Sequence, residues 1–377
     1  MKKHEPDPKD PHNESDYSVR ELSEDWNEKL LEITRKTPVR SGDLSIHFDR
    51  SPDIFVLPRL TSYKMVPLGF FRKEQLIGFA IASYQKRYVS GVLTDFIYLG
   101  NMHGTQKGTG QIFLQQLEKR VQRKVKTRPD VKYMYAYVMA WNRPAEKLAK
   151  LGVLGSKPIG TITMATLFTL KPMRSSSKFT VRKATIADSE QIIPLLSNAF
   201  KGQLLAPEMN QAVFQHNLNH RPGITIEDYY VATRGEEIIG TCLAWDMTAF
   251  KKNRIQFRDV KMRSIHMAYN LSARLLGSPA LPRSGEAFRD VTIAEYAVRD
   301  QDPEIMEALL RSIYHECRNK GYQTVILGYA AGSSIAEAIQ PFIYKEVRSH
   351  VIIAPLQSDV PVYFHPEKNI YADAIQI

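Results

Sequence analysis

Cysteine is nearly absent from this sequence, and its scarcity excludes two structural classes. Only Cys242 and Cys317 occur among 377 residues, too few for a disulfide scaffold or a cysteine-rich zinc site. Without disulfides to form, the chain is expected to work in the reducing cytoplasm. Cys317 follows His315 by two residues, so a nucleophilic role stays open, although such close neighbours on a helix usually face different ways.

Long apolar runs are missing as well. No stretch approaches the roughly 20 apolar residues that a helix needs to cross a bilayer. The first residues, Met1–Glu5, lead into further charge rather than into an apolar signal segment. We therefore expect neither a membrane partner nor a secretory leader. A length of 377 residues with 43% hydrophobic content suits a globular chain of about two domains.

Acidic residues are too few to balance the basic ones, and the net charge is +11. Such a charge suits either a nucleic-acid surface or attraction for an anionic cofactor. Two stretches hold much of it: residues 107–128 contain seven basic residues and one acidic, and residues 250–289 contain nine and two. No nucleic-acid-binding motif accompanies either stretch, so we do not expect a nucleic-acid partner.

Glycines cluster in one loop, Gly104–Gly110, which lies between a predicted strand and a predicted helix. The strand, Gly91–Leu99, is rich in β-branched and aromatic residues. After the loop, Leu114, Leu117 and Val121 recur at helical spacing. A glycine turn at a helix N-terminus lets an anion reach N–H groups that have no intrahelical partner. The alternative is an ordinary turn before a surface helix.

Three phosphate-binding devices compete for this loop. A Walker loop needs Ser or Thr after Gly-Lys, but Lys107 precedes Gly108; a dinucleotide fingerprint needs a third glycine at position 113, which is Phe. The loop instead resembles the acyl-CoA pyrophosphate loop of the GNAT superfamily of N-acyltransferases, usually Gln/Arg-x-x-Gly-x-Gly/Ala. Gly108 and Gly110 match its glycines, whereas Thr105 stands where Gln or Arg is usual.

A second segment extends the resemblance. The predicted strand Lys132–Trp141 leads into Asn142–Gly152, similar to the GNAT segment in which Asn begins a short helix that a Gly ends. The resemblance implies that one set of residues contacts acyl-CoA: Leu99, Gly100, Asn101, Thr105, Gln106, Lys107, Gly108, Thr109, Gly110 and Asn142.

The resemblance also implies the chemistry: transfer of an acetyl group from acetyl-CoA, used as a co-substrate, to an amine that the residues do not identify. A backbone N–H near Leu99–Asn101 would polarise the thioester. The family's usual acid, a Tyr on the short helix, is replaced here by Ala149. We predict Tyr137 as the proton donor or as part of the substrate wall, and Asp95 as the base, with His103 a weaker candidate for acid or base. The alternatives are that Tyr137 packs under a helix and that Asp95 is a solvated or paired acid.

The beginning of the chain repeats. Phe179–Arg182 echoes Tyr17–Arg20, and Ile239-Gly240 echoes Ile77-Gly78 at the same offset. We predict an α/β fold (mixed α+β sheets) of two tandem GNAT-like domains, each a twisted mixed sheet flanked by helices. The predicted divisions are a disordered tail 1–16, a domain 17–173, a linker 174–178, and a domain 179–377 with the basic insert 250–289. The predicted strand Ile159–Leu170 is expected to close the sheet of the first domain.

The second copy lacks the glycine pair. Depending on a small gap, either Glu304 and Met306 or Met306 and Ala308 align opposite Gly108 and Gly110. Asp302 with the following Pro303 forms a self-contained N-cap. Carboxylates at that helix end would repel a pyrophosphate, so we expect one acyl-CoA per chain, in the N-terminal copy. The runner-up interpretation is a non-catalytic acyl-CoA-binding or regulatory protein. A homodimer is a further expectation.

Overall fold

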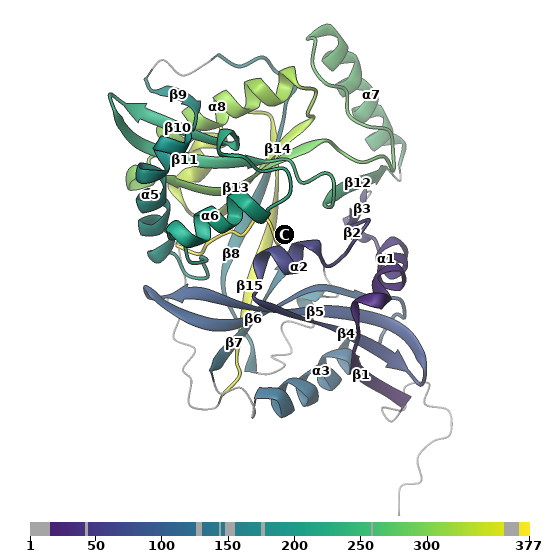
Figure 1. Cartoon of the computed structure of the whole chain (residues 1–377). Coiled ribbons are helices and arrows are strands. Elements are labelled where there is room, and N and C mark those ends of the chain that lie inside the picture. The colour runs from purple at the N-terminus through teal and green to yellow at the C-terminus, as the bar shows by residue number, and fades with distance from the viewer. Residues whose placement is uncertain are drawn as a thin grey trace, which may run out of the picture.

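The computed structural model describes residues 16–41, 44–125, 130–142, 145–147, 155–174, 178–257, 259–357 and 369–377. One twelve-stranded mixed sheet runs through this part of the chain, with helices on both of its faces (Figure 1). The predicted tail and linker therefore lie largely outside the described residues.

In the part of the chain that the structure describes, the first half contributes eight strands and three α-helices with defined bounds, and residues 145–147 are also helical. The strands are β1 (Tyr17–Glu21), β2 (Val39–Ser41), β3 (Leu44–Asp49), β4 (Lys64–Arg72), β5 (Gln75–Val89), β6 (Val92–Gly104), β7 (Val131–Met139) and β8 (Lys157–Phe168). The helices are α1 (Asn27–Lys36), α2 (Val56–Thr61) and α3 (Gly110–Val125), with a 3-10 turn at Glu24–Trp26.

The second half repeats this order except that β12 and α7 are added and the equivalents of β2 and β3 are missing from its described residues. Its strands are β9 (Thr180–Lys183), β10 (Tyr229–Arg234), β11 (Glu237–Trp245), β12 (Lys252–Phe257), β13 (Asp290–Val298), β14 (Thr324–Ala330) and β15 (Tyr344–Pro355). Its helices are α5 (Ser189–Lys201), α6 (Gln211–His220), α7 (Val260–Leu275) and α8 (Pro303–Asn319), with 3-10 turns at Ile186–Asp188, Ile226–Asp228, Arg299–Gln301 and Ser334–Ile339.

The two halves exchange their last strands. The order across the sheet is β1-β4-β5-β6-β7-β15-β8-β14-β13-β11-β10-β9. In this order β15 pairs with β7, placing Val351 opposite Tyr137, and β8 pairs with β14, placing Ala165 opposite Leu327. The prediction that 159–170 closes the first sheet is therefore wrong. β8 is buried in the middle of the sheet, and apolar periodicity specifies a central strand without specifying its neighbours.

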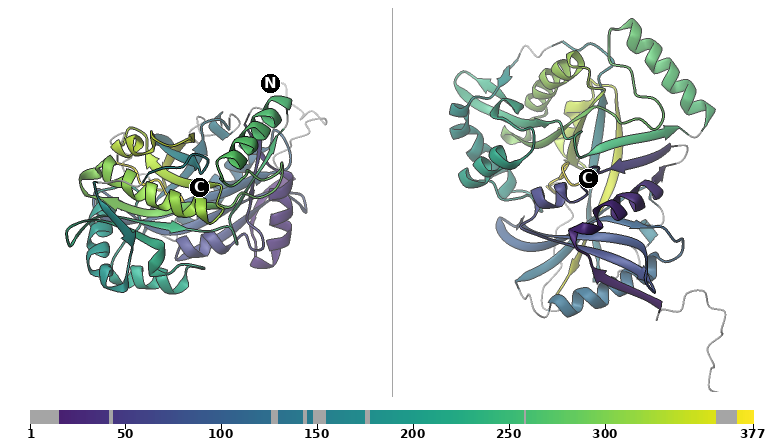
Figure 2. Two further views of the ribbon diagram at one scale, coloured as in Figure 1. Left: turned by 90° about the horizontal axis from the view of Figure 1, so that it is seen from above. Right: turned by 45° about the vertical axis from the view of Figure 1, so that its right-hand side comes forward.

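A small three-stranded sheet also joins the halves, in the order β12-β3-β2. β12, from the basic insert, pairs antiparallel with β3 and sets Ile255 opposite Ile46. The insert continues into α7, which projects from the body of the molecule (Figures 1 and 2). Among the described side chains of α7, only Ala273 is buried.

The two faces of the first half have different cores. On one face, Phe113 and Leu117 of α3 pack against Ile97 and Leu99 of β6. On the other face, alternate residues of β6 and β7 form an aromatic cluster, and α1 packs on β5 beside it. Helices cover both faces because strands inside a large sheet are apolar on both sides. No helix among the described residues is long and apolar enough to span a bilayer.

Candidate active site

The glycine loop leads from the end of β6 directly into α3, as the sequence predicts. Gly108 has a φ of 83°, in the left-handed region that glycine adopts at no steric cost. Thr109 is buried, and its hydroxyl donates to the Gln106 carbonyl at 2.9 Å. The first turn of α3 contains no acidic residue. The loop therefore presents an uncompensated helix N-terminus, which suits an anion.

Thr105, the departure from the usual family pattern, anchors the loop. Its N–H and its hydroxyl both donate to the Ile77 carbonyl of β5, at 2.8 and 2.9 Å. Lys107, two residues further on, is exposed. The threonine thus ties the loop to the sheet, and the positive charge at the loop comes from Lys107.

Strands β6 and β7 form a fork beside this loop. They pair in parallel from Asp95 opposite Val131 to Tyr98 opposite Tyr135. β6 continues to Gly104, while β7 continues along β15. The two strands therefore part after Tyr98 and leave their backbone groups on the inner edges of the fork unpaired with each other.

A bulge in β6 lies just beyond the point where the fork opens. Ile81 of β5 faces Gly100, but Phe79 faces His103, so β6 uses one more residue than β5 between these pairs. Asn101, within the bulge, has a φ of 49°, which is uncommon for a residue other than glycine. Bulges turn backbone groups in new directions. The bulge thus falls in the stretch Leu99–Asn101 that the family resemblance assigns to the thioester.

Three tyrosines line the face of the fork opposite α3. The rings of Tyr98 and Tyr135 lie 5.1 Å apart, and the ring of Tyr137 lies 5.7 Å from each. The Tyr135 hydroxyl donates to Gln85 Oε1 at 2.6 Å. The Tyr137 hydroxyl is buried and has no hydrogen-bond partner among the described residues. Burial raises the pKa of Tyr137 well above its usual value, so this phenol holds its proton.

His103 lies on the same side of the sheet, stacked on Phe79 at 5.3 Å. Its Nδ1 is 2.8 Å from the hydroxyl of Thr37, which itself donates to the Ile33 carbonyl. Because that hydroxyl has one proton to give, we assign the Nδ1–H tautomer, which leaves a lone pair on Nε2. Burial and the charge of Arg50 lower the pKa of His103 to about 4, so the ring is neutral at pH 7.

Arg50, which follows β3, brings a buried positive charge to this region. The residue is 6% exposed, and one guanidinium nitrogen has no partner among the described residues. Burial lowers the pKa of Arg50 to about 10, well above neutral pH, so the group remains charged. Its charge acts on both Tyr98 and His103. Arg50 therefore has a free donor near the fork.

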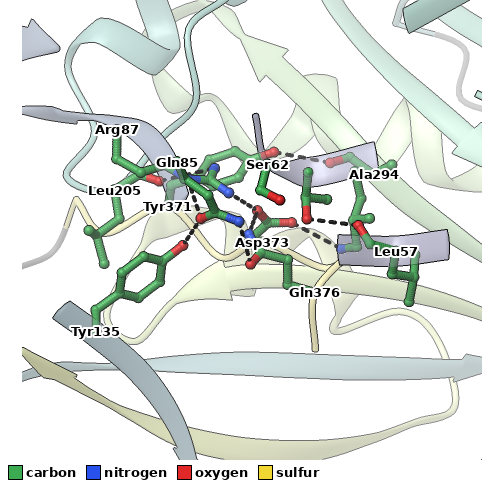
Figure 3. A network of polar contacts seen from close by, with 12 residues as sticks. Leu57, Ser62, Gln85, Arg87, Tyr135, Leu205, Ala294, Tyr371, Asp373 and Gln376 are labelled. Atoms are coloured by element: carbon green, nitrogen blue, oxygen red, sulfur yellow. Dashed lines mark hydrogen bonds and ion pairs between the residues drawn. The ribbon is translucent and has the colours of Figure 1, made fainter. Parts of the chain in front are cut away.

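A buried polar network ties this face to the last described segment, residues 369–377 (Figure 3). Arg87 donates to Asp373 Oδ2 at 3.0 Å, and both side chains are at most 5% exposed. Arg87 also donates to Gln85 Oε1 at 3.0 Å, and Gln85 donates to Gln376 at 3.0 Å. Sequence analysis missed this network. No local pattern around Arg87 indicates a partner that lies 286 residues further along the chain.

Two other predicted residues occupy different places. Asp95 lies where β6 and β7 are still paired, and its carboxylate accepts from the Tyr63 hydroxyl at 2.7 Å. Asn142 follows β7, and its side chain accepts from the Ala145 N–H at 3.4 Å, as an N-cap does. Ala149 and the glycine at position 152 lie outside the described residues.

The second copy has its own fork between β13 and β14, which pair from Asp290 to Ile293. At the following helix, Asp302 accepts from the Glu304 N–H at 2.8 Å, as its N-cap pattern predicts, and Glu304 pairs with Lys178 at 2.5 Å. A cavity of about 610 Å³ remains in this fork, lined partly by the loop Arg299–Gln301. The N-terminus of α8 beside this fork is already occupied by carboxylates of the chain itself.

The cysteines do not form a catalytic site. Cys317 is buried, and burial raises the pKa of its thiol to about 12, whereas His315 on the same helix is exposed. Within the described residues, no three His, Cys, Asp or Glu side chains gather as a metal site would require. The fork and its loop are therefore the main concentration of reactive and anion-binding groups that we find.

Solved structures of acyltransferases resemble this architecture. A GCN5-related N-acetyltransferase from Sphaerobacter thermophilus matches 92% of this chain and 98% of its own, with a TM-score of 0.58 and 13% identity. Saccharomyces cerevisiae N-myristoyltransferase, solved with bound myristoyl-CoA and inhibitors, matches 96% of this chain and 87% of its own, with a TM-score of 0.57 and 12% identity. No family model and no curated protein matches the sequence.

These likenesses confirm the predicted α/β class, a mixed sheet flanked by helices. Because the sequence identities are low, the likenesses establish the fold alone. The chain has the GNAT fold, duplicated within one continuous sheet.

Proposed function

We propose that the chain is an acyl-CoA-dependent N-acyltransferase that moves an acetyl group to an amine in the fork between β6 and β7. The observation that carries the proposal is the continuity of three features: a strand fork, a bulge at its mouth, and a glycine loop opening an uncompensated helix N-terminus. The structural neighbour N-myristoyltransferase holds myristoyl-CoA on the same fold, which supports a CoA thioester as the co-substrate.

The binding half of the proposal follows from the loop. The pyrophosphate would meet the first-turn N–H groups of α3, and Gly108 would let it approach the backbone. The pantetheine arm would extend into the fork, where the inner strand edges offer unpaired backbone groups. The thioester would then reach the bulge at Asn101, where a backbone N–H polarises its carbonyl.

The chemical half concerns two proton transfers. The amine nitrogen attacks the thioester carbon, the C–S bond breaks, and an amide and CoA are formed. We assign Tyr137 as the donor that protonates the leaving thiolate, because its buried hydroxyl keeps its proton. We assign His103 rather than Asp95 to take the proton from the amine, because the Nδ1–H tautomer leaves a lone pair on Nε2 whereas Asp95 already accepts from Tyr63.

Calorimetric titration with acetyl-CoA tests the binding half. Gly108→Asp places a carboxylate beside the pyrophosphate and should abolish binding, whereas Gly235→Asp is the matched control. Gly235 also has a positive φ, 62°, and lies in an exposed turn with no atom near its missing Cβ. Both variants should lose similar stability, but only the first should lose acyl-CoA. Equal affinity in the two variants would place the CoA site elsewhere.

Release of free CoA thiol tests the chemical half. With acetyl-CoA and a panel of amines, an acyltransferase releases thiol in proportion to acceptor concentration. Tight binding of acetyl-CoA with no thiol release for any amine would instead support an acyl-CoA sensor, the alternative function that the sequence suggested.

A further inference from the structure

A pocket lies at the end of β7, at the junction of the two halves. It encloses about 230 Å³. This volume exceeds that of a single water and is below the roughly 300–1,000 Å³ typical of drug-sized ligand sites. We propose that this pocket receives the acceptor, and that the acceptor is a small primary amine on an apolar body the size of one ring. The proposal rests on the proposed acyltransfer function, because it names that reaction's second substrate.

The position of the pocket relates it to the reaction. Met139 and Trp141, at and just after the end of β7, line it. Met139 and Tyr137 lie two residues apart on one strand and therefore point to the same face, the one opposite α3. The loop that would hold the CoA phosphates begins α3. An acceptor in the pocket would thus approach the thioester from the face that the nucleotide part of CoA leaves free.

The walls of the pocket are mostly apolar. Phe168 of β8 and Ile326 of β14 line it from the large sheet, while Phe48 of β3 and Ile255 of β12 line it from the small sheet. Because β3 belongs to one half and β12 to the other, the pocket needs both halves. An apolar body that leaves water for such walls binds more tightly than a polar one of equal size.

The charged groups of the pocket do not favour a polycation. Its lining contains two basic residues, Lys251 and Lys345, and two acidic ones, Asp290 and Glu346. Asp290 already accepts from Asn253 at 2.8 Å. Glu346 accepts from the Tyr329 hydroxyl. Polyamines and aminoglycosides would find no surplus of carboxylates here, so a single amine on an apolar body fits better.

Burial weakens even these charges. It lowers the pKa of Lys251 to about 7 and raises the pKa of Asp290, so both groups are driven towards their neutral forms. The Lys251 ammonium is engaged with the carbonyls of Ala374 and Ile375, at 2.6 and 3.2 Å. The pocket therefore offers shape and apolar surface rather than ionic contacts.

The experiment compares acceptors and then fills the pocket, using full-length protein and acetyl-CoA. 2-Phenylethylamine should give a kcat/KM roughly 10- to 100-fold above that of ethanolamine, which has the same amine on a polar body. Ile326→Trp should remove that preference while the affinity for acetyl-CoA stays unchanged. The matched control is Ile265→Trp on α7, where Ile265 is 51% exposed and does not line the pocket.

Three outcomes would overturn the proposal: no preference for the aromatic amine, a preference that survives in Ile326→Trp, or a preference for spermidine. If Ile326→Trp instead weakens octanoyl-CoA binding and leaves acceptor preference intact, the pocket holds the acyl chain. Should Ile326→Trp fail to fold, Ile255→Trp replaces it, and the wild-type acceptor comparison still decides. Failure of the proposed function is a separate result, because the wild type would then not bind acetyl-CoA or would release no thiol with any amine.

Discussion

Two buried polar side chains near the fork have atoms that lack hydrogen-bond partners in the part of the chain that the structure describes. Tyr137 keeps an unpaired buried hydroxyl, and Arg50 keeps an unpaired guanidinium nitrogen, as judged among the described residues. Leaving a buried polar group unsatisfied costs about 1–3 kcal/mol. Such groups are retained most readily where a ligand completes their hydrogen bonds.

The two tyrosines of β7 provide a matched pair of substitutions. Tyr137→Phe removes an unpaired hydroxyl, so stability should hold or rise slightly while kcat falls about 10²- to 10⁴-fold. Tyr135→Phe removes a hydroxyl bonded to Gln85 and should cost about 1–2 kcal/mol of unfolding free energy with less effect on kcat. Urea denaturation and steady-state kinetics measure both. An active Tyr137→Phe enzyme would remove this residue from the mechanism.

His103 predicts a pH dependence of stability. Its folded pKa, about 4, lies below the unfolded value of about 6.5, so the unfolded chain takes up a proton first as pH falls. The stabilisation that the folded state gains by keeping His103 neutral is present above pH 6.5 and is lost towards pH 4. Between pH 7 and 5 the wild type should lose at most about 2 kcal/mol more than His103→Gln. Parallel urea curves for the two proteins at both pH values would contradict the assignment.

At the scale of elements, local patterns could be predicted more readily than pairing partners. Two-residue alternation alone places Tyr133, Tyr135 and Tyr137 of β7 on one face, and the glycine loop indicated the start of α3. The depth of Arg50 could not be predicted, because it depends on β3 pairing with β12, some 200 residues away. The partner of β8 was missed for the same reason, because the apolar sequence of a strand in the middle of a sheet does not specify which strand pairs with it.

The capped end of α8 gives a prediction at this scale. Asp302→Ala removes the capping oxygen and should cost about 1 kcal/mol, whereas Asp302→Ser keeps one and should cost less. Neither substitution should change acyl-CoA stoichiometry, which we expect to be one per chain. Thermal unfolding and calorimetric titration give the two readouts. A second acyl-CoA of similar affinity in the wild type would show that the second fork binds it too.

For the molecule as a whole, the pair of Arg87 and Asp373 joins strand β5 to the last segment of the chain. Asp373→Ala leaves a buried guanidinium uncompensated and should cost about 3–5 kcal/mol. The double variant Arg87→Met with Asp373→Leu removes both charges and should recover much of that loss. Chemical denaturation of the two variants measures the difference. Equal losses would mean that the pair contributes through shape rather than charge.

The exchange of last strands has a consequence for the history and the engineering of the chain. Cutting between residues 174 and 178 would separate β8 from its partners and leave the edge of β7 open, so each fragment would expose unpaired strand edges. A single-copy ancestor could satisfy the same pairing only as an intertwined dimer, each subunit lending its final strand to the other. Fusion of two such genes would fix the strand exchange within one polypeptide. The second copy could then lose the glycines of its loop while the first copy kept the acyl-CoA site.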